Sequence, residues 1–133
     1  MTAPPDPTHK TVVLVVDDNA PMRMVAMAML RSLGYTPLEA DGPPAALALL
    51  ESRRDVALVL MDIVMPGGMS GIELAAELRR RNLAPQILFT SGFANANQAG
   101  ELELSDDELL SKPYRKADLA HRIKALLAGA PKN

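Results

Sequence analysis

Two short, continuously apolar runs constrain the fold of this chain more than any other feature of its sequence. Residues 11–16 read Thr-Val-Val-Leu-Val-Val, and residues 56–61 read Val-Ala-Leu-Val-Leu-Met. Short runs of this kind, rich in β-branched residues and without polar alternation, are typical of strands buried on both faces of a parallel sheet. An aspartate follows each run directly. We therefore expect two buried strands whose carboxyl ends carry acidic side chains.

Segments with helical spacing alternate with these runs. Asn19 is a suitable helix N-cap, Pro21 suits a first turn, and Gly34 suits a helix C-terminus. Ser70 and Glu73 form a capping-box pattern at the start of a later helix. The expected helices cover residues 19–33, 43–52, 70–82 and 115–128, and the further expected strands cover residues 36–40, 85–90 and 108–111. Strands alternating with helices predict an α/β fold with right-handed crossovers, here a doubly wound parallel sheet of five strands.

Length and composition indicate one domain without covalent cross-links. The 133 residues include no cysteine, which excludes disulfides and thiolate metal sites and fits a reducing cytoplasm. The formal net charge is -2, which is not the positive balance typical of nucleic-acid binding. No apolar run approaches the ~20 residues of a membrane span, and the N-terminus lacks a signal-peptide pattern. We expect a cytoplasmic protein that binds neither nucleic acid nor membrane.

The two ends of the chain differ from its centre. Residues 1–9 contain three prolines and few residues to bury, so we expect a disordered tail there. The predicted domain covers residues 10–129, and a second short tail covers residues 130–133. Because little chain lies outside this domain, we expect its output to pass through a separate protein.

Chemically useful side chains follow four of the five predicted strands. In chain order these are Asp17-Asp18, Asp62, Thr90-Ser91 and Lys112-Pro113. Each is an ordinary turn or cap residue when taken singly, but the carboxyl ends of parallel strands meet at one edge, where ligands of such sheets bind. Three carboxylates gathered there repel one another unless a cation balances them. Oxygen ligands without histidine or cysteine favour Mg²⁺, Mn²⁺ or Ca²⁺.

The order and spacing of these motifs resemble the receiver domain of bacterial two-component response regulators. The resemblance covers residues 11 to 128. The motifs that carry it are Val-Val-Asp-Asp-Asn, Val-Leu-Met-Asp-Ile-Val-Met-Pro-Gly with Gly71 after it, Ile-Leu-Phe-Thr-Ser-Gly-Phe, and Leu-Ser-Lys-Pro-Tyr. The resemblance implies a flavodoxin-like, CheY-like fold and a role in phosphorelay signal transduction.

The resemblance also implies a role for each strand-end residue. Asp62 corresponds to the phosphoacceptor of the family. Asp18 corresponds to a direct ligand of Mg²⁺ and Asp17 to a ligand that acts partly through water, with Asp62 and the backbone carbonyl of Val64 completing the protein's share. Lys112 corresponds to the lysine that pairs with the phosphoryl oxygens. The implied phosphodonor is a sensor histidine kinase or a phosphotransfer protein.

Two positions leave the switch of such a domain open. The family has a serine or threonine just before a small residue at the end of the fourth strand, which Ser91 before Gly92 fits better than Thr90 does. The family commonly has an aromatic residue three positions before the lysine, where this chain has Leu109. The usual coupled movement of that aromatic residue is therefore not expected here, and Phe93 or Tyr114 are alternatives.

The stretch after the fourth strand departs from the family. Residues 94–100 read Ala-Asn-Ala-Asn-Gln-Ala-Gly and contain no large apolar side chain. A short helix with nothing to bury is marginal in water, and asparagine and glycine lower its propensity further. We expect the fourth helix of the fold to be short, frayed or disordered, and its order to change on phosphorylation.

Three functions remain open from the sequence. The first is a phosphoacceptor domain that catalyses only its own aspartyl phosphorylation and dephosphorylation, and then switches a downstream protein target or relays the phosphoryl group. The second is a module of the same fold that acts by protein contacts without phosphorylation. The third is a phosphatase of the haloacid dehalogenase type, which is disfavoured because Val64 stands where those enzymes carry a second aspartate.

Overall fold

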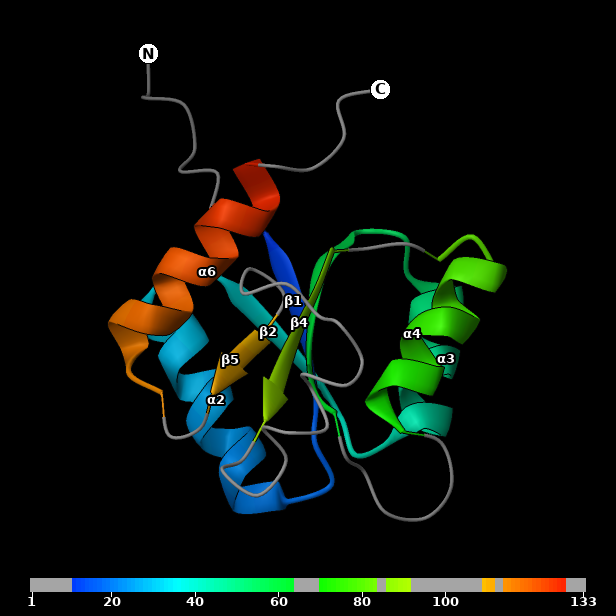
Figure 1. Cartoon of the computed structure of the whole chain (residues 1–133), viewed down its shortest axis with the longest axis horizontal. Helices are drawn as coiled ribbons and strands as arrows, with labels where there is room; N and C mark the ends of the chain where they lie inside the picture. Colours follow the sequence, from blue (N-terminus) through cyan, green and yellow to red (C-terminus); the bar gives the residue numbers. More distant parts are fainter. Residues whose placement is uncertain (1–10, 64–69, 84–85, 92–108, 112–113, 129–133) are drawn as a thin grey trace.

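The computed structural model describes residues 11–63, 70–83, 86–91, 109–111 and 114–128. Within these ranges, nine elements follow one another (Figure 1). They are β1 (Val12–Val16), α2 (Ala20–Ser32), β2 (Thr36–Ala40), α3 (Pro43–Ser52), β3 (Val56–Asp62), α4 (Gly71–Arg80), β4 (Gln86–Ser91), β5 (Leu109–Ser111) and α6 (Lys116–Ala128). The predicted alternation of strands and helices is confirmed. The expected weak helix at residues 94–100 lies outside the described residues.

The five strands form one parallel sheet in the order β2-β1-β3-β4-β5. The chain moves outward from β1 to β2 and then returns to place β3 on the other side of β1. The direction of winding therefore reverses between β1 and β3. In Figure 1, α2 and α6 cover one face of the sheet, and α3 and α4 cover the other. This arrangement confirms the doubly wound sheet expected from the sequence.

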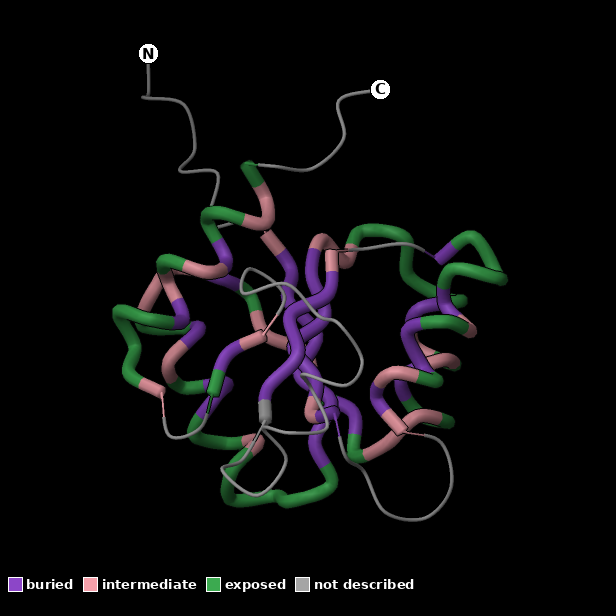
Figure 2. Tube along the Cα trace, viewed as in Figure 1, coloured by how far each residue is buried: buried purple, intermediate pink, exposed green. Residues whose placement is uncertain are grey.

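The sheet separates two hydrophobic clusters, and alternate residues of each strand point to opposite ones. On the α3 and α4 face, Val16, Met61 and Phe89 occupy matching positions of three neighbouring strands. On the α2 and α6 face, the matching positions one residue earlier are Val15, Leu60 and Leu88, which pack against helix residues. These helix residues are Ala26, Met27 and Leu30 of α2, and Leu119 and Ile123 of α6. Figure 2 shows the buried strands lying between these half-buried helices.

Local capping fixes where the helices begin and end. The Asn19 side chain accepts a hydrogen bond from the Met22 amide at 3.0 Å and starts α2. Ser70 and Glu73 form both hydrogen bonds of the predicted capping box at the start of α4. Helix α4 ends at Arg80, two residues before the expected end, because Asn82 adopts a left-handed conformation with φ of 61°. None of the helices described is long and apolar enough to cross a membrane.

Candidate functional site

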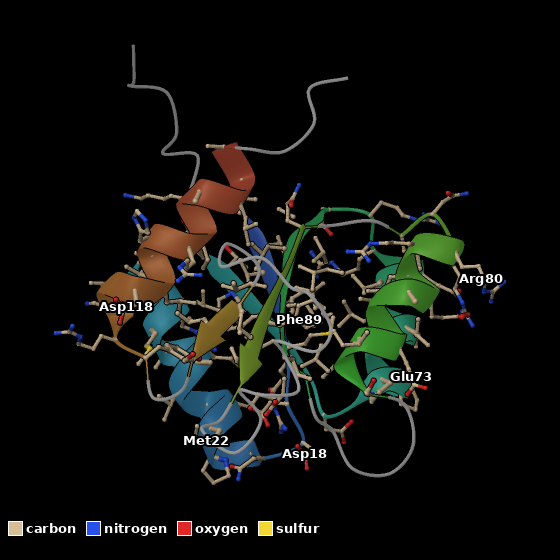
Figure 3. The ribbon with its side chains drawn as sticks, in the orientation of Figure 1. Asp18, Met22, Glu73, Arg80, Phe89 and Asp118 are labelled. Atoms are coloured by element: carbon tan, nitrogen blue, oxygen red, sulfur yellow. The ribbon has the colours of Figure 1, made fainter. Side chains whose placement is uncertain are left out.

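Asp17 and Asp62 lie at the carboxyl ends of the neighbouring strands β1 and β3, where the winding of the sheet reverses. Val16 of β1 pairs with Met61 of β3, so the two aspartates each follow a paired residue by one position. Neighbouring strands are about 4.8 Å apart, which brings the two backbones close together at this edge. Asp17 is 8 % exposed and Asp62 is partly exposed, whereas Asp18 is exposed. Figure 3 shows Asp18 at this edge of the sheet, near Met22 of α2.

Hydrogen bonds hold the turn between β1 and α2 at Asp17. Its amide donates to the Ala40 carbonyl of β2 at 3.1 Å, and its Oδ1 accepts from the Asn19 amide at 2.9 Å. Its carbonyl accepts from Nη1 of Arg23 at 2.7 Å. The acidic pair is therefore anchored both to the neighbouring strand and to the helix that follows it.

The backbone of Asp62 is fixed by a close contact with the start of α4. The Gly71 amide donates to the Ile63 carbonyl at 2.8 Å. A Cβ atom at Gly71 would lie 2.2 Å from the Asp62 carbonyl oxygen, a distance that real Cβ atoms do not reach. Glycine is therefore required where α4 begins, because the helix terminus packs directly on the residue that ends β3.

Thr90 pairs with Asp62 in the register of β3 and β4. Its side chain is 4 % exposed, and its hydroxyl donates to the Met61 carbonyl over a long 3.5 Å. The Ile63 amide donates to the Thr90 carbonyl at 3.0 Å, so pairing of the two strands continues past Asp62. Strand alternation places Asp62 and Thr90 on the face that α2 and α6 cover. Ser91 ends β4 one position further on, and its side chain lies outside the description.

Tyr114 lies on the face of the sheet toward which Asp62 and Thr90 point. It precedes α6 and packs against the hydrophobic cluster on the α2 and α6 face. Burial raises the pKa of the Tyr114 hydroxyl to about 12, and the negative charges of Asp17 and Asp62 add to this shift. Both aspartates are thus near enough to act on one phenol. The pairing of Val16 with Met61 likewise brings these two aspartates, 45 positions apart along the chain, to one edge of the sheet.

The strand-end residues predicted from the sequence are only partly described. Asp17, Asp62 and Thr90 meet at one edge, and Asp18 lies beside them on the turn, whereas Lys112 and Val64 fall outside the described residues. Within the described ranges, no three acidic or histidine side chains form a ready cluster for a metal ion. The carboxylate oxygens at this edge nevertheless suit Mg²⁺, because this ion keeps several water ligands and commonly binds only one or two carboxylates of a protein.

The roles of Arg23 and Gly71 in holding the backbone of the acidic residues in place were not predicted from the sequence. Arg23 follows the Asn19 cap by one helical turn, and a side chain there points back toward the helix N-terminus. That spacing is a usable sequence signal. The contact of Gly71 with Asp62 has no comparable signal, because it depends on how α4 packs against the sheet.

Comparisons with known proteins identify the class to which this fold and this acidic edge belong. The family model for the response regulator receiver domain matches residues 13–124, and this chain belongs to that family. It is 37% identical over 118 residues to the phosphate regulon transcriptional regulatory protein PhoB of Pseudomonas aeruginosa. It is 35% identical over 126 residues to the transcriptional regulatory protein ResD of Bacillus subtilis. These matches cover 86% and 94% of the chain, but 51% of each relative, so the chain spans about half their length.

A solved structure with a bound metal ion is also similar to this chain. The receiver domain of a sensor histidine kinase from Pseudomonas aeruginosa PAO1 superposes with a TM-score of 0.75 at 28% identity. The match covers 90% of this chain and 98% of that one. That receiver domain carries a magnesium ion coordinated in its active-site cleft.

Proposed function

We propose that Asp62 accepts a phosphoryl group from a phosphohistidine of a sensor histidine kinase or phosphotransfer protein, in a reaction that requires Mg²⁺. The observation that carries this proposal is the position of Asp62, partly exposed at the reversal point of the sheet and beside Asp17. Membership of the receiver-domain family and the magnesium ion in a related receiver domain support it.

The reaction follows from the chemistry of these groups. A carboxylate oxygen of Asp62 attacks phosphorus, an O–P bond forms, the P–N bond to histidine breaks, and the imidazole leaves with the bonding electron pair. Asp17 and Asp18, with Asp62 and the Val64 carbonyl, would hold Mg²⁺, which offsets negative charge on the transferring oxygens. Lys112 would pair with the same oxygens. Catalysis of this kind depends mainly on positioning and electrostatics. The chain acts only on its own aspartate.

The acyl phosphate adds charge and strong acceptor oxygens at the end of β3. Ser91 is the preferred candidate for the hydroxyl that donates to it, and Thr90 is the alternative. Thr90 lies beside Asp62 in register and its present hydrogen bond is long, so little holds its hydroxyl in place. Movement of either hydroxyl would change the end of β4 and the segment that follows it.

Exposed apolar side chains beside the site suit a docking surface for the phosphodonor. The described residues include three large, exposed apolar side chains, and all three belong to α2: Met22, Met24 and Val25. Helix α2 begins two residues after Asp18, so a protein that brings phosphohistidine to Asp62 must approach this helix. Methionine is flexible and polarisable and is common on binding surfaces.

We propose that residues 10–129 act as one phosphorylatable unit in the cytoplasm, and that its output passes to a downstream protein or a further phosphoryl carrier. PhoB and ResD are transcriptional regulators about twice as long as this chain. We assign no nucleic-acid or membrane contact to the unit itself, because the chain is slightly acidic overall.

Intact mass spectrometry after incubation with a small phosphodonor and Mg²⁺ tests the proposal. We expect a gain of one phosphoryl group in the wild-type protein, no gain in Asp62→Asn, and no gain after chelation of the metal. Labelling of Asp62→Asn would refute the assignment of Asp62. A folded wild-type protein that is never labelled would favour the contact-only module, and turnover of a generic phosphate ester would favour a phosphatase.

A further inference from the structure

Arg23 of α2 connects three elements at the acidic edge. Its Nη1 donates to the Asp17 carbonyl at 2.7 Å, and its Nε donates to Oε1 of Glu39 on β2 at 2.7 Å. The Arg23 side chain is 16% exposed and that of Glu39 is 52% exposed. The guanidinium is therefore mostly enclosed, while its acidic partner faces solvent.

The carbonyl that Arg23 holds belongs to the peptide group between Asp17 and Asp18. A change in the ψ angle of Asp17 or the φ angle of Asp18, the torsions on either side of this peptide group, would redirect the two acidic side chains relative to each other. The Asp17 amide donates to the Ala40 carbonyl, and its carboxylate accepts from the Asn19 amide. Arg23 adds a further restraint, because it holds the carbonyl of the same turn. Hydrogen bonds from a charged donor are stronger than neutral ones.

A simple surface ion pair does not account for this contact. Exposed arginine–carboxylate pairs contribute little to stability. Arg53 and Asp55 form such a pair, with both side chains about half exposed, and the side-chain bonds of Arg53 to described residues go to Asp55. Arg23 differs because its second bond goes to the backbone of the acidic turn.

We propose that Arg23 is a positioning residue for the divalent cation: it fixes the Asp17–Asp18 peptide so that both carboxylates face the ion, and Glu39 orients its guanidinium. This inference rests on the proposed function, because it concerns the same cation site. Groups that orient metal ligands typically change metal affinity by 10–100-fold when they are removed.

Whether removal of Arg23 weakens or tightens Mg²⁺ binding distinguishes a positioning role from an effect of its charge alone. A cation beside the acidic pair repels Mg²⁺, so if Arg23 acted only through its charge, its removal would tighten Mg²⁺ binding. If Arg23 positions the ligands, its removal weakens binding. Arg23→Lys keeps the charge but cannot bond Glu39 and the carbonyl with the same planar group.

The test is a Mg²⁺ titration of the unphosphorylated full chain by isothermal calorimetry. We expect Arg23→Ala to weaken Mg²⁺ binding about 10-fold, Arg23→Lys and Glu39→Ala to weaken it less, and the matched control Arg53→Ala to leave it unchanged. Amide hydrogen exchange of Asn19 in the metal-free protein gives a second readout, and we expect faster exchange in Arg23→Ala. Thermal unfolding shows that each variant is folded.

Equal or tighter Mg²⁺ binding by folded Arg23→Ala would overturn the inference. If Arg23→Ala fails to fold, Arg23→Lys decides, and unchanged affinity in that variant overturns the inference. A folded wild-type protein that binds no Mg²⁺ would instead refute the proposed function and the inference together. Wild-type binding with an unaffected arginine variant would refute the inference alone.

Discussion

Gly71 and Asp62 are in backbone contact: a Cβ atom on the first residue of α4 would fall 2.2 Å from the carbonyl oxygen of the last residue of β3. The first residue of α4 thus packs so closely on Asp62, the proposed phosphoacceptor, that no methyl group fits between them. The backbone of Asp62 is positioned by packing as well as by strand pairing.

Gly71→Ala should therefore destabilise the protein. The new methyl group must displace backbone, and overpacking of this kind costs about 3 kcal/mol at the upper end of its usual range. Urea unfolding measures the effect. Gly42→Ala is the matched control, because the nearest atom to a Cβ there is Pro44 Cδ at 3.9 Å, and we expect little change. Equal stability of the two variants would contradict the contact. Folded Gly71→Ala should also be phosphorylated more slowly than the wild-type protein by a small phosphodonor.

The two candidate hydroxyls can be separated by Ser91→Ala and Thr90→Val. We expect both variants to accept a phosphoryl group, because neither removes the nucleophile. Ser91→Ala should lose most of the spectral change that phosphorylation causes in amide NMR spectra, whereas Thr90→Val should retain it. Thr90→Val should change stability by no more than about 1 kcal/mol, because it removes one long hydrogen bond. The reverse pattern would make Thr90 the switch.

The Tyr114 hydroxyl should titrate abnormally. Its pKa is raised to about 12, first by burial and then by the charges of Asp17 and Asp62. A raised pKa in the folded state means that the unfolded chain loses this proton first. Tyr114 therefore contributes stability that is fully present below pH 10 and is lost as the pH rises through about 12.

Ultraviolet titration of a Tyr35→Phe protein would isolate the Tyr114 signal, because the chain has two tyrosines. In that background, Asp62→Asn should lower the pKa of Tyr114 but leave it above 10, since burial is the larger cause. The uncharged Thr90→Val is the control. An unchanged pKa in Asp62→Asn would mean that Asp62 does not face Tyr114.

Docking on α2 can be tested by changing the phosphodonor. Met24 is 67% exposed, and Met24→Lys should slow phosphoryl transfer from a protein donor by about 10-fold, the equivalent of losing 1.4 kcal/mol of contact. Labelling by a small phosphodonor should not change, because the site itself is intact. Ala76→Lys on the exposed side of α4 is the control. Slowing with both donors would point to damage of the site rather than to docking.

Much of this protein could be predicted from its sequence because the signals involved are local. The apolar runs that precede Asp17 and Asp62 predicted strands buried on both faces. Asn19 and Ser70 predicted the starts of two helices, because each caps its helix with its own side-chain hydrogen bond. Periodicity and capping depend on residues within a few positions of one another. The sheet, its class and the edge that carries the acidic residues followed from them.

Other features were decided only by the tertiary structure. The pairing of Asp62 with Thr90, the closeness of Gly71 to Asp62, and the bond of Arg23 to Glu39 all depend on how segments separated in the chain align. The hydrophobic pattern of a strand fixes which of its residues face each side, but which residue of the neighbouring strand stands opposite depends on how segments far apart in the chain pack together. The sequence therefore determined which residues reach this edge, and packing across the sheet decided which of them touch.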